Sequence, residues 1–194
     1  MKEIIFSKYS NERSRSFAIR TDILEENGKR WLEKTWLYPE GKEHILRMSQ
    51  LSEILNELYG EIPFVSNKCE AKENCVQLEY LEEKNLAEYL DDLLEKGKTE
   101  EAKSIFTGYL ENVKRIHSKK PFKMTEDFKK VFGCTKMPEG LTCTEVTNID
   151  MICDNVVLTS PYTLLDYEWT FEFPVPCEFV LYRIIHYYIQ VHKV

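Results

Sequence analysis

Three absences narrow the functions open to this 194-residue chain. No apolar run approaches the roughly 20 residues that a membrane-spanning helix requires. No stripe of lysine and arginine rises above an acidic background with a net charge of -7, so nucleic acid is not an expected partner. The N-terminal residues Met1 to Phe6 are too few and too charged for a signal peptide. We therefore expect a cytoplasmic protein without a transmembrane segment.

Zinc-site and disulfide patterns are missing as well. The sequence contains no CxxC pair and no histidine at zinc-ligand spacing from a cysteine. An even number of cysteines would permit three disulfides, but a cytosolic chain of this size does not need them. We expect reduced and mostly buried thiols at the six positions, which are Cys69, Cys75, Cys134, Cys143, Cys153 and Cys177.

The composition is that of a folded domain, and the first 80 residues read as strands with one helix. With 43% apolar and 30% charged residues, the chain fits one domain or one small two-lobed unit. Asn27-Gly28 is a tight hairpin signal, while Pro39 suits the start of a helix and Gly60 its end. We expect strands at 3–6, 16–23, 30–37, 62–65 and 75–81, and a helix at 39–59.

The remainder of the chain is mainly helical. Asn85 is a helix cap, and apolar stripes predict helices at about 85–96 and 99–117. Residues 118–147 read as irregular, and a hairpin is expected from Val156 to Leu165. A last helix is expected at about 177–191. The nearby aromatic residues are expected to pack this half rather than stack on a sugar; they are Tyr162, Tyr167, Trp169, Phe171 and Phe173.

Two acidic residues and an asparagine are spaced like the core of a phosphotransferase. Asn155 follows Asp150 by five residues, and Asp166 comes eleven residues later, after the expected hairpin. Such chemistry needs one carboxylate to meet an incoming hydroxyl. It also needs an amide oxygen and a second carboxylate to hold Mg²⁺ on nucleotide phosphates. Since Asp and Asn also favour turns, the three residues could simply be turn residues.

The order of elements and these motifs resemble the protein-kinase-like superfamily, closer to its aminoglycoside phosphotransferase and small-molecule kinase branch. They also resemble small kinase-like domains associated with bacterial surface-polysaccharide glycosyltransferases and methyltransferases. The resemblance is carried by Asn148-Ile149-Asp150 to Asn155 and by Asp166 to Pro174, with weaker support from Lys8 to Arg13 and Glu43-His44-Ile45. It implies an α+β, two-lobed fold: an antiparallel N-lobe sheet plus one helix (about 1–80), a hinge (about 77–84) and a reduced, mainly helical C-lobe (about 85–194).

The resemblance also implies a role for individual residues, with ATP and Mg²⁺ as cofactors. Lys34, which shares a strand face with Leu32 and Trp36, matches the lysine that holds the α- and β-phosphates. Asp150 matches the base that orients the acceptor hydroxyl, and Asn155 and Asp166 match the metal ligands. In the hinge, the Glu79 carbonyl and the Leu81 amide would meet adenine.

The N-terminal half departs from the family pattern. Residues 7–16 contain no glycine, so the glycine-rich phosphate loop is absent. Lys8, Arg13 or Arg15 could supply charge in place of the missing backbone donors. Glu43 or His44 is expected near Lys34 as its helix partner, although a histidine on an apolar helix face is more often a hydrogen-bonded core residue than a catalytic group.

The C-terminal half departs too. Asn148 stands where the family usually has histidine, and only 28 residues follow Asp166, which leaves no room to hold a peptide substrate. One interpretation is a phosphotransferase acting on a hydroxyl of a small molecule or glycan. Another is a pseudokinase that partners, or is fused to, a glycosyltransferase or methyltransferase. The third is an α+β interaction domain whose three polar residues are a coincidence.

Overall fold

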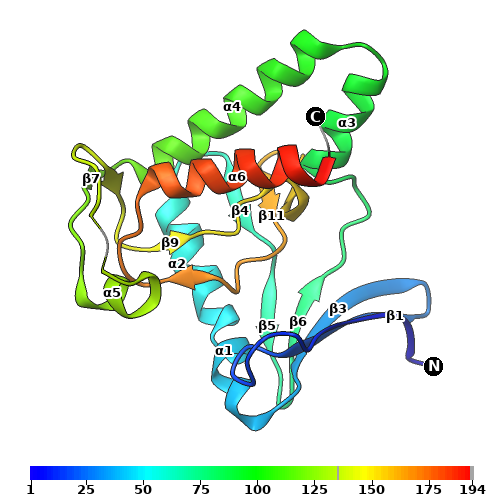
Figure 1. Cartoon of the computed structure of the whole chain (residues 1–194). Helices are drawn as coiled ribbons and strands as arrows, with labels where there is room; N and C mark the ends of the chain where they lie inside the picture. The colour runs from blue at the N-terminus through cyan, green and yellow to red at the C-terminus, as the bar shows by residue number, and fades with distance from the viewer. Residues whose placement is uncertain (135, 193–194) are drawn as a thin grey trace. The chain divides into compact units, whose positions relative to one another are not determined.

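The protein has an α+β fold, seen in a computed structural model that describes residues 1–134 and 136–192 (Figure 1). The chain forms two compact units. Unit 1 consists of Met1–Ile54 and Ser66–Glu82, and unit 2 of Leu55–Val65 and Glu83–Val194. Within the described part of the chain, no helix is both long and apolar enough to cross a membrane.

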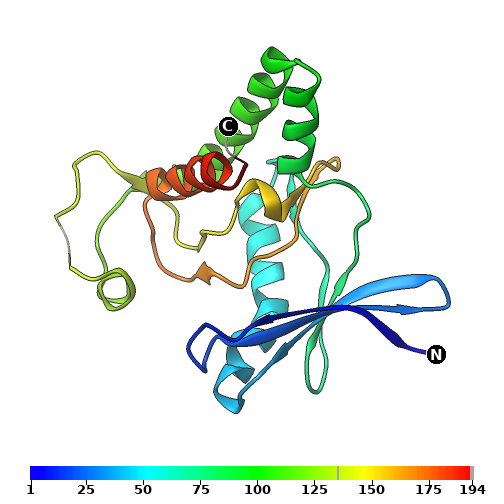
Figure 2. The same ribbon diagram turned by 45° about the vertical axis from the view of Figure 1, so that its right-hand side comes forward.

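Unit 1 is built on a five-stranded antiparallel sheet with the order β1-β2-β3-β6-β5 (Figure 2). Asn27 and Gly28 have φ values of 51° and 76°, which is the backbone of the predicted tight hairpin, and they join β2 to β3. β2 begins three residues later than predicted because residues 11–17 form turns and bends. The strands are β1 (Glu3–Ser10), β2 (Ile19–Glu26), β3 (Lys29–Trp36), β5 (Cys69–Ala71) and β6 (Val76–Glu79).

The helix predicted at 39–59 is broken into three pieces: η1 (Pro39–Gly41), α1 (Lys42–Leu46) and α2 (Met48–Tyr59). Pro39 opens the first piece, as its fixed φ favours. α1 packs against β3, and a side chain at Gly41 would come within 3.2 Å of the Trp36 Cβ. This close approach favours glycine directly before α1, because a Cβ there would force its neighbour to shift by a few tenths of an ångström.

One predicted strand belongs to a different sheet. The sequence pattern indicated residues 62–65 as part of the large sheet, but β4 (Phe64–Ser66) pairs with β11 (Tyr162–Leu164), which in turn pairs with β10 (Val156–Val157). One edge of the large sheet is β5, a strand that the sequence pattern did not indicate. Pairing partners lie far apart in the sequence, so a strand pattern does not reveal which sheet the strand joins.

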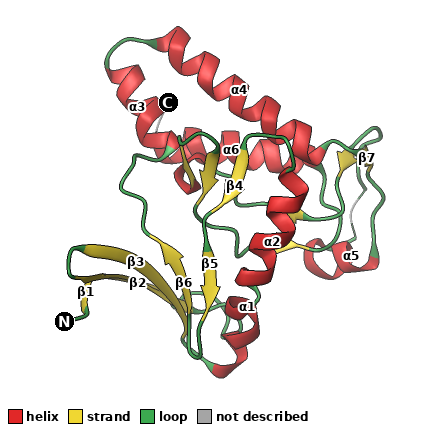
Figure 3. Cartoon of the chain, turned by 180° about the vertical axis from the view of Figure 1, so that it is seen from behind, coloured by secondary structure: helices red, strands yellow, loops and turns green. Residues whose placement is uncertain are grey.

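Unit 2 is mainly helical, and Figure 3 shows α3 and α4 as a helical hairpin. Its helices are α3 (Leu86–Glu95), α4 (Thr99–His117), α5 (Glu126–Phe132) and α6 (Cys177–His192). Asn85 caps α3 as predicted: its side chain accepts a hydrogen bond from the Glu88 N–H, and the Glu88 carboxylate accepts one from the Asn85 N–H. α4 has the predicted bounds, and the last helix was predicted to within one residue.

The stretch 118–147 is more regular than we predicted. Besides α5, it contains β7 (Lys120–Pro121), β8 (Thr142–Cys143) and β9 (Thr147–Asn148), and β9 pairs with β12 (Thr170–Phe171). α5 is short, and Thr125 caps it. All six cysteines are free, with Cys134 exposed and the others half-buried or buried, as expected.

Candidate active site in unit 2

The backbone of residues 149–151 is held in place by hydrogen bonds from several elements of unit 2. The Ile149 N–H donates to the Trp169 carbonyl at 3.2 Å, and the Ile149 carbonyl accepts from Arg183 Nε at 2.9 Å. The Met151 carbonyl accepts from the buried hydroxyl of Tyr109 at 2.6 Å. This short loop is therefore fixed by α4, α6 and the segment after Asp166.

Two asparagines complete the support of Asp150. The Asp150 N–H donates to Asn148 Oδ1 at 2.9 Å, and the Asp150 carbonyl accepts from Asn155 Nδ2 at 3.1 Å. Asn148, which stands where the family usually has histidine, is fully buried and thus serves to shape the turn. Asn155 is held in η2 (Cys153–Asn155), where its N–H donates to the Ile152 carbonyl at 2.9 Å.

The hairpin predicted after Asn155 is confirmed, and it returns the chain to the same place. β10 and β11 pair antiparallel with Val156 opposite Leu164. The Leu165 N–H donates to the Asn155 carbonyl at 2.8 Å, so Asp166 is the residue directly after this contact. The β9–β12 pairing then ties the segments on either side together, with Asn148 opposite Thr170. Asp150, Asn155 and Asp166 are thereby brought together within unit 2.

The two carboxylates interact electrostatically. Burial raises the pKa of Asp150 above its ordinary value, and the negative charge of Asp166 raises it further. Arg183 opposes both effects because its Nη2 lies 2.6 Å from Asp150 Oδ1. The side chains of Arg183 and Asp150 are only 19% and 14% exposed, so this ion pair is shielded from solvent. Asp150 is thus a held carboxylate whose affinity for a proton is increased.

The arrangement fits a hard divalent cation only as a partial ligand set. The Asn155 amide donates through Nδ2 to Asp150, which leaves its oxygen Oδ1 as the possible ligand, and Asp166 supplies a carboxylate. Among residues 1–134 and 136–192, no group of three His, Cys, Asp or Glu side chains could hold a metal. Mg²⁺ commonly takes only one or two protein ligands and completes its shell with water and phosphate oxygens. In that mode of binding, Asn155 and Asp166 would be the two protein ligands.

The predicted phosphate-binding lysine lies in unit 1. Lys34 is in the middle of β3, opposite Thr21 on β2 and Val76 on β6, and only 5% of its surface is exposed. A lysine is seldom so buried unless it is paired. α1, which packs against β3, carries the two candidate partners: Glu43 is exposed and His44 is half-buried, with its ring 4.9 Å from that of Phe17.

The other predicted nucleotide-binding residues are also in unit 1. The Glu79 carbonyl, at the end of β6, already accepts a hydrogen bond from Asn67 Nδ2 at 2.8 Å, so adenine would have to share this oxygen. Leu81 follows β6 outside any strand and is half-buried. Lys8 is exposed on β1, and Arg13 is half-buried in the turn after it.

Arg183 and Tyr109 are the site residues that the sequence pattern did not indicate. Both lie on amphipathic helices, where they read as parts of ordinary helix faces. A weak signal was present for Arg183, because an arginine flanked by apolar and aromatic residues on a helix often has a buried or half-buried partner. The nature of that partner could not be read from the helix alone.

Comparison of the sequence with models of known protein families and with curated proteins finds no match. The function is therefore inferred from the residues themselves.

Proposed function

We propose that this protein is an ATP- and Mg²⁺-dependent phosphotransferase with a two-lobed, protein-kinase-like fold. Its acceptor would be a hydroxyl of a small molecule or saccharide, with bacterial surface-polysaccharide synthesis as a setting that the resemblance suggests. One observation supports the proposal: Asp150 lies on a loop whose backbone is held by hydrogen bonds, Asn155 is bonded to that loop, and the hairpin returns the chain to Asn155 directly before Asp166. Hydrogen bonds that fix the backbone of a loop also preorganise the side chains it carries, as a catalytic site requires.

In the proposed reaction each residue of this site has a distinct part. Asp150 accepts a hydrogen bond from the acceptor hydroxyl, and its increased proton affinity suits it to receive the proton as the bond to phosphorus forms. Arg183 holds Oδ1 and so leaves Oδ2 to face the acceptor. Asn155 and Asp166 would hold Mg²⁺, which neutralises charge on the transferring phosphoryl group.

The proposed phosphoryl transfer forms one bond and breaks another. The acceptor oxygen forms a bond to the γ-phosphorus of ATP, and the bond between that phosphorus and the β–γ bridging oxygen breaks. ADP leaves, and the hydroxyl proton goes to the Asp150 carboxylate. Lys34 would bind the α- and β-phosphates. Its replacement by Met should weaken nucleotide binding without changing which acceptor the protein prefers.

A specific observation favours a second function, a pseudokinase that binds nucleotide or a partner enzyme without turnover. Arg183 is already paired with the carboxylate that should serve as the base. Together with the absence of glycine in residues 7–16, this contact favours a site that keeps its structure but does not catalyse phosphate transfer. A glycosyltransferase or methyltransferase is the partner that the resemblance suggests.

Thermal unfolding with and without ATP and Mg²⁺ tests the first proposal. A ligand that binds only the folded protein stabilises it by about 2.7 kcal/mol at 100 times its Kd. We expect Mg²⁺-dependent stabilisation by ATP in the wild type and its loss in Asp166→Asn. Asp127→Asn is the matched control because Asp127 is exposed on α5 and paired only with Lys130 among the described residues. Normal Mg²⁺-ATP binding by Asp166→Asn would refute the assignment. Binding by the wild type without phosphate transfer would support the pseudokinase.

A further inference from the structure

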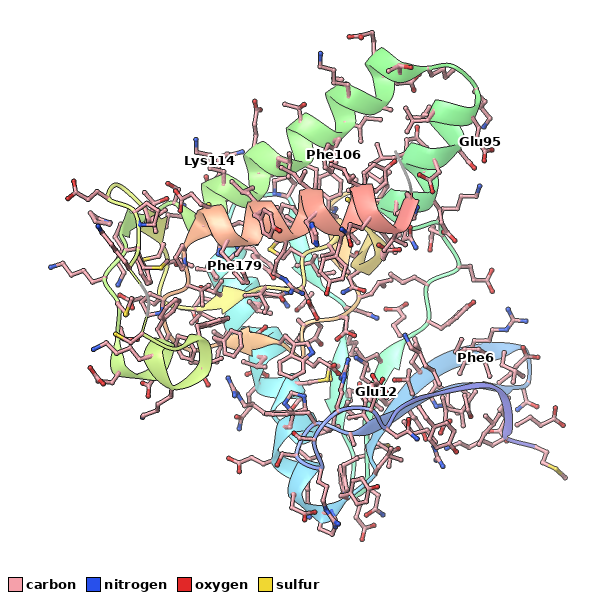
Figure 4. The ribbon with its side chains drawn as sticks, viewed as in Figure 1. Phe6, Glu12, Glu95, Phe106, Lys114 and Phe179 are labelled. Carbon is pink, nitrogen blue, oxygen red and sulfur yellow. The ribbon has the colours of Figure 1, made fainter. Side chains whose placement is uncertain are left out.

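Unit 2 contains an apolar pocket next to the elements that hold Asp150. Its volume is about 300 Å³, at the lower end of the range for small-molecule sites. Phe128 and Phe132 of α5 form one side, and Phe179 of α6 faces Phe132 with ring centroids 5.7 Å apart. Met137, Leu141 and Val175 also line the pocket. Figures 1 and 2 show α5 and the first turn of α6 at the same end of unit 2, and Figure 4 labels Phe179 there.

The pocket offers almost nothing to a polar ligand. Of its described lining residues only Glu178 is charged, and both of its carboxylate oxygens accept hydrogen bonds from Thr142, at 3.2 and 3.3 Å. A sugar placed here would lose its hydrogen bonds to water without replacement, at a cost of kilocalories per hydroxyl. An aromatic ring or a short alkyl chain would lose nothing comparable and would be removed from water.

Two connections link the pocket to Asp150. Phe179 and Arg183 are four residues apart on α6, so they lie on the same face about one turn, or roughly 6 Å, from each other. Arg183 Nη2 is 2.6 Å from Asp150 Oδ1. On the other side of the pocket, the Val175 N–H donates to Thr147 Oγ1 at 3.3 Å, and Thr147 lies in the strand that leads into Asp150. The pocket and the proposed base therefore share two supports, α6 and the strand that contains Thr147.

We propose that this pocket is the acceptor subsite and that it binds the apolar part of the acceptor. The substrate class is then an alcohol with an aromatic or alkyl group, rather than a fully hydroxylated sugar. This inference rests on the proposed function, since it gives the pocket the task of presenting a hydroxyl to Asp150.

Binding is tested first, in the whole protein and without nucleotide, by NMR of methionine methyl groups labelled with ¹³C. Met137 lines the pocket, Met151 follows Asp150, and Met48 lies in unit 1 as an internal control. The probes are hexan-1-ol and sorbitol, which have the same number of carbons and differ in polarity. We expect hexan-1-ol to shift the Met137 signal saturably and sorbitol to leave it unchanged. Each methylene added from ethan-1-ol onward should tighten binding about fourfold, from roughly 0.8 kcal/mol per buried CH₂.

Leu141→Trp and Val131→Trp form a matched pair of variants. Leu141 lines the pocket and is half-buried, whereas Val131 is 53% exposed on α5 and does not line it. Filling the pocket through Leu141→Trp should abolish the Met137 shift, and Val131→Trp should retain it. Unchanged binding in Leu141→Trp, or an equal response of Met137 to sorbitol, would overturn the subsite.

Phosphate transfer from Mg²⁺-ATP then separates this inference from the proposed function. We expect ³¹P NMR to show hexyl phosphate formed faster than sorbitol phosphate, with the preference lost in Leu141→Trp. Transfer to sorbitol but not to hexan-1-ol would overturn the apolar acceptor and leave the phosphotransferase intact. Transfer to neither alcohol, together with no Mg²⁺-ATP binding, would overturn both.

Discussion

His117 should make this protein sensitive to mild acid. The residue is the last of α4 and is fully buried, with Nε2 3.3 Å from the sulfur of Met151 and Nδ1 without a hydrogen-bond partner among the described residues. Burial lowers the pKa of His117 from its usual 6.5 to about 4. The neutral imidazole is thus the form that the folded protein accommodates.

The sign and size of the effect follow from this difference. Because the folded pKa is the lower one, the unfolded chain binds the proton first as the pH falls below 6.5, and stability is lost until the pH reaches the folded value. A gap from 6.5 to about 4, at about 1.36 kcal/mol per pH unit, corresponds to roughly 3 kcal/mol in total. Between pH 7 and 4.5 the expected loss is about 2.4 kcal/mol.

His117→Leu removes the titrating group while keeping the site apolar. Urea unfolding followed by circular dichroism at pH 7 and at pH 4.5 gives the loss of stability for each protein. Other groups contribute equally to both proteins, so the variant should lose about 2.4 kcal/mol less than the wild type over this range. His186→Leu, on the half-buried face of α6, is the control and should behave as the wild type does. An identical pH dependence for the wild type and His117→Leu would refute the reasoning.

Three further predictions concern contacts within unit 2. Arg183→Gln leaves the Asp150 carboxylate buried and unpaired, so urea unfolding should show that the free energy of unfolding falls by about 3–5 kcal/mol. Adding Asp150→Asn in the double variant should restore most of this loss. Additive losses would contradict the coupling. Tyr109→Phe removes the donor to a buried carbonyl and should cost about 1–3 kcal/mol by the same measurement, and a cost near zero would mean that the bond is not needed. The pairing with Asp91 raises the pKa of His192 despite burial, which opposes it. The stabilisation that this pairing provides should therefore be present below pH 6.5 and disappear as the pH rises through the pKa of His192 in the folded protein. In an unfolding series from pH 6 to 9, His192→Gln should show no such change.

Elements specified by neighbouring residues could be predicted from the sequence. The Asn27-Gly28 turn, the Asn85 cap and the bounds of α4 each depend on side chains within a few positions of one another. The hairpin after Asn155 belongs to the same class, because its turn and register are local. The approach of Asn155 to Asp166 was therefore already determined by the sequence.

Contacts between distant segments were decided only by the tertiary structure. The pattern of residues 62–65 indicated a strand but could not show that β4 pairs with β11. Likewise, α6 shows an apolar face in the sequence, yet only packing places Arg183 beside Asp150 and closes the apolar pocket with Phe179. The physical reason is that a residue's propensity acts along the chain, whereas ion pairs, burial and the resulting pKa changes depend on which surfaces meet in space.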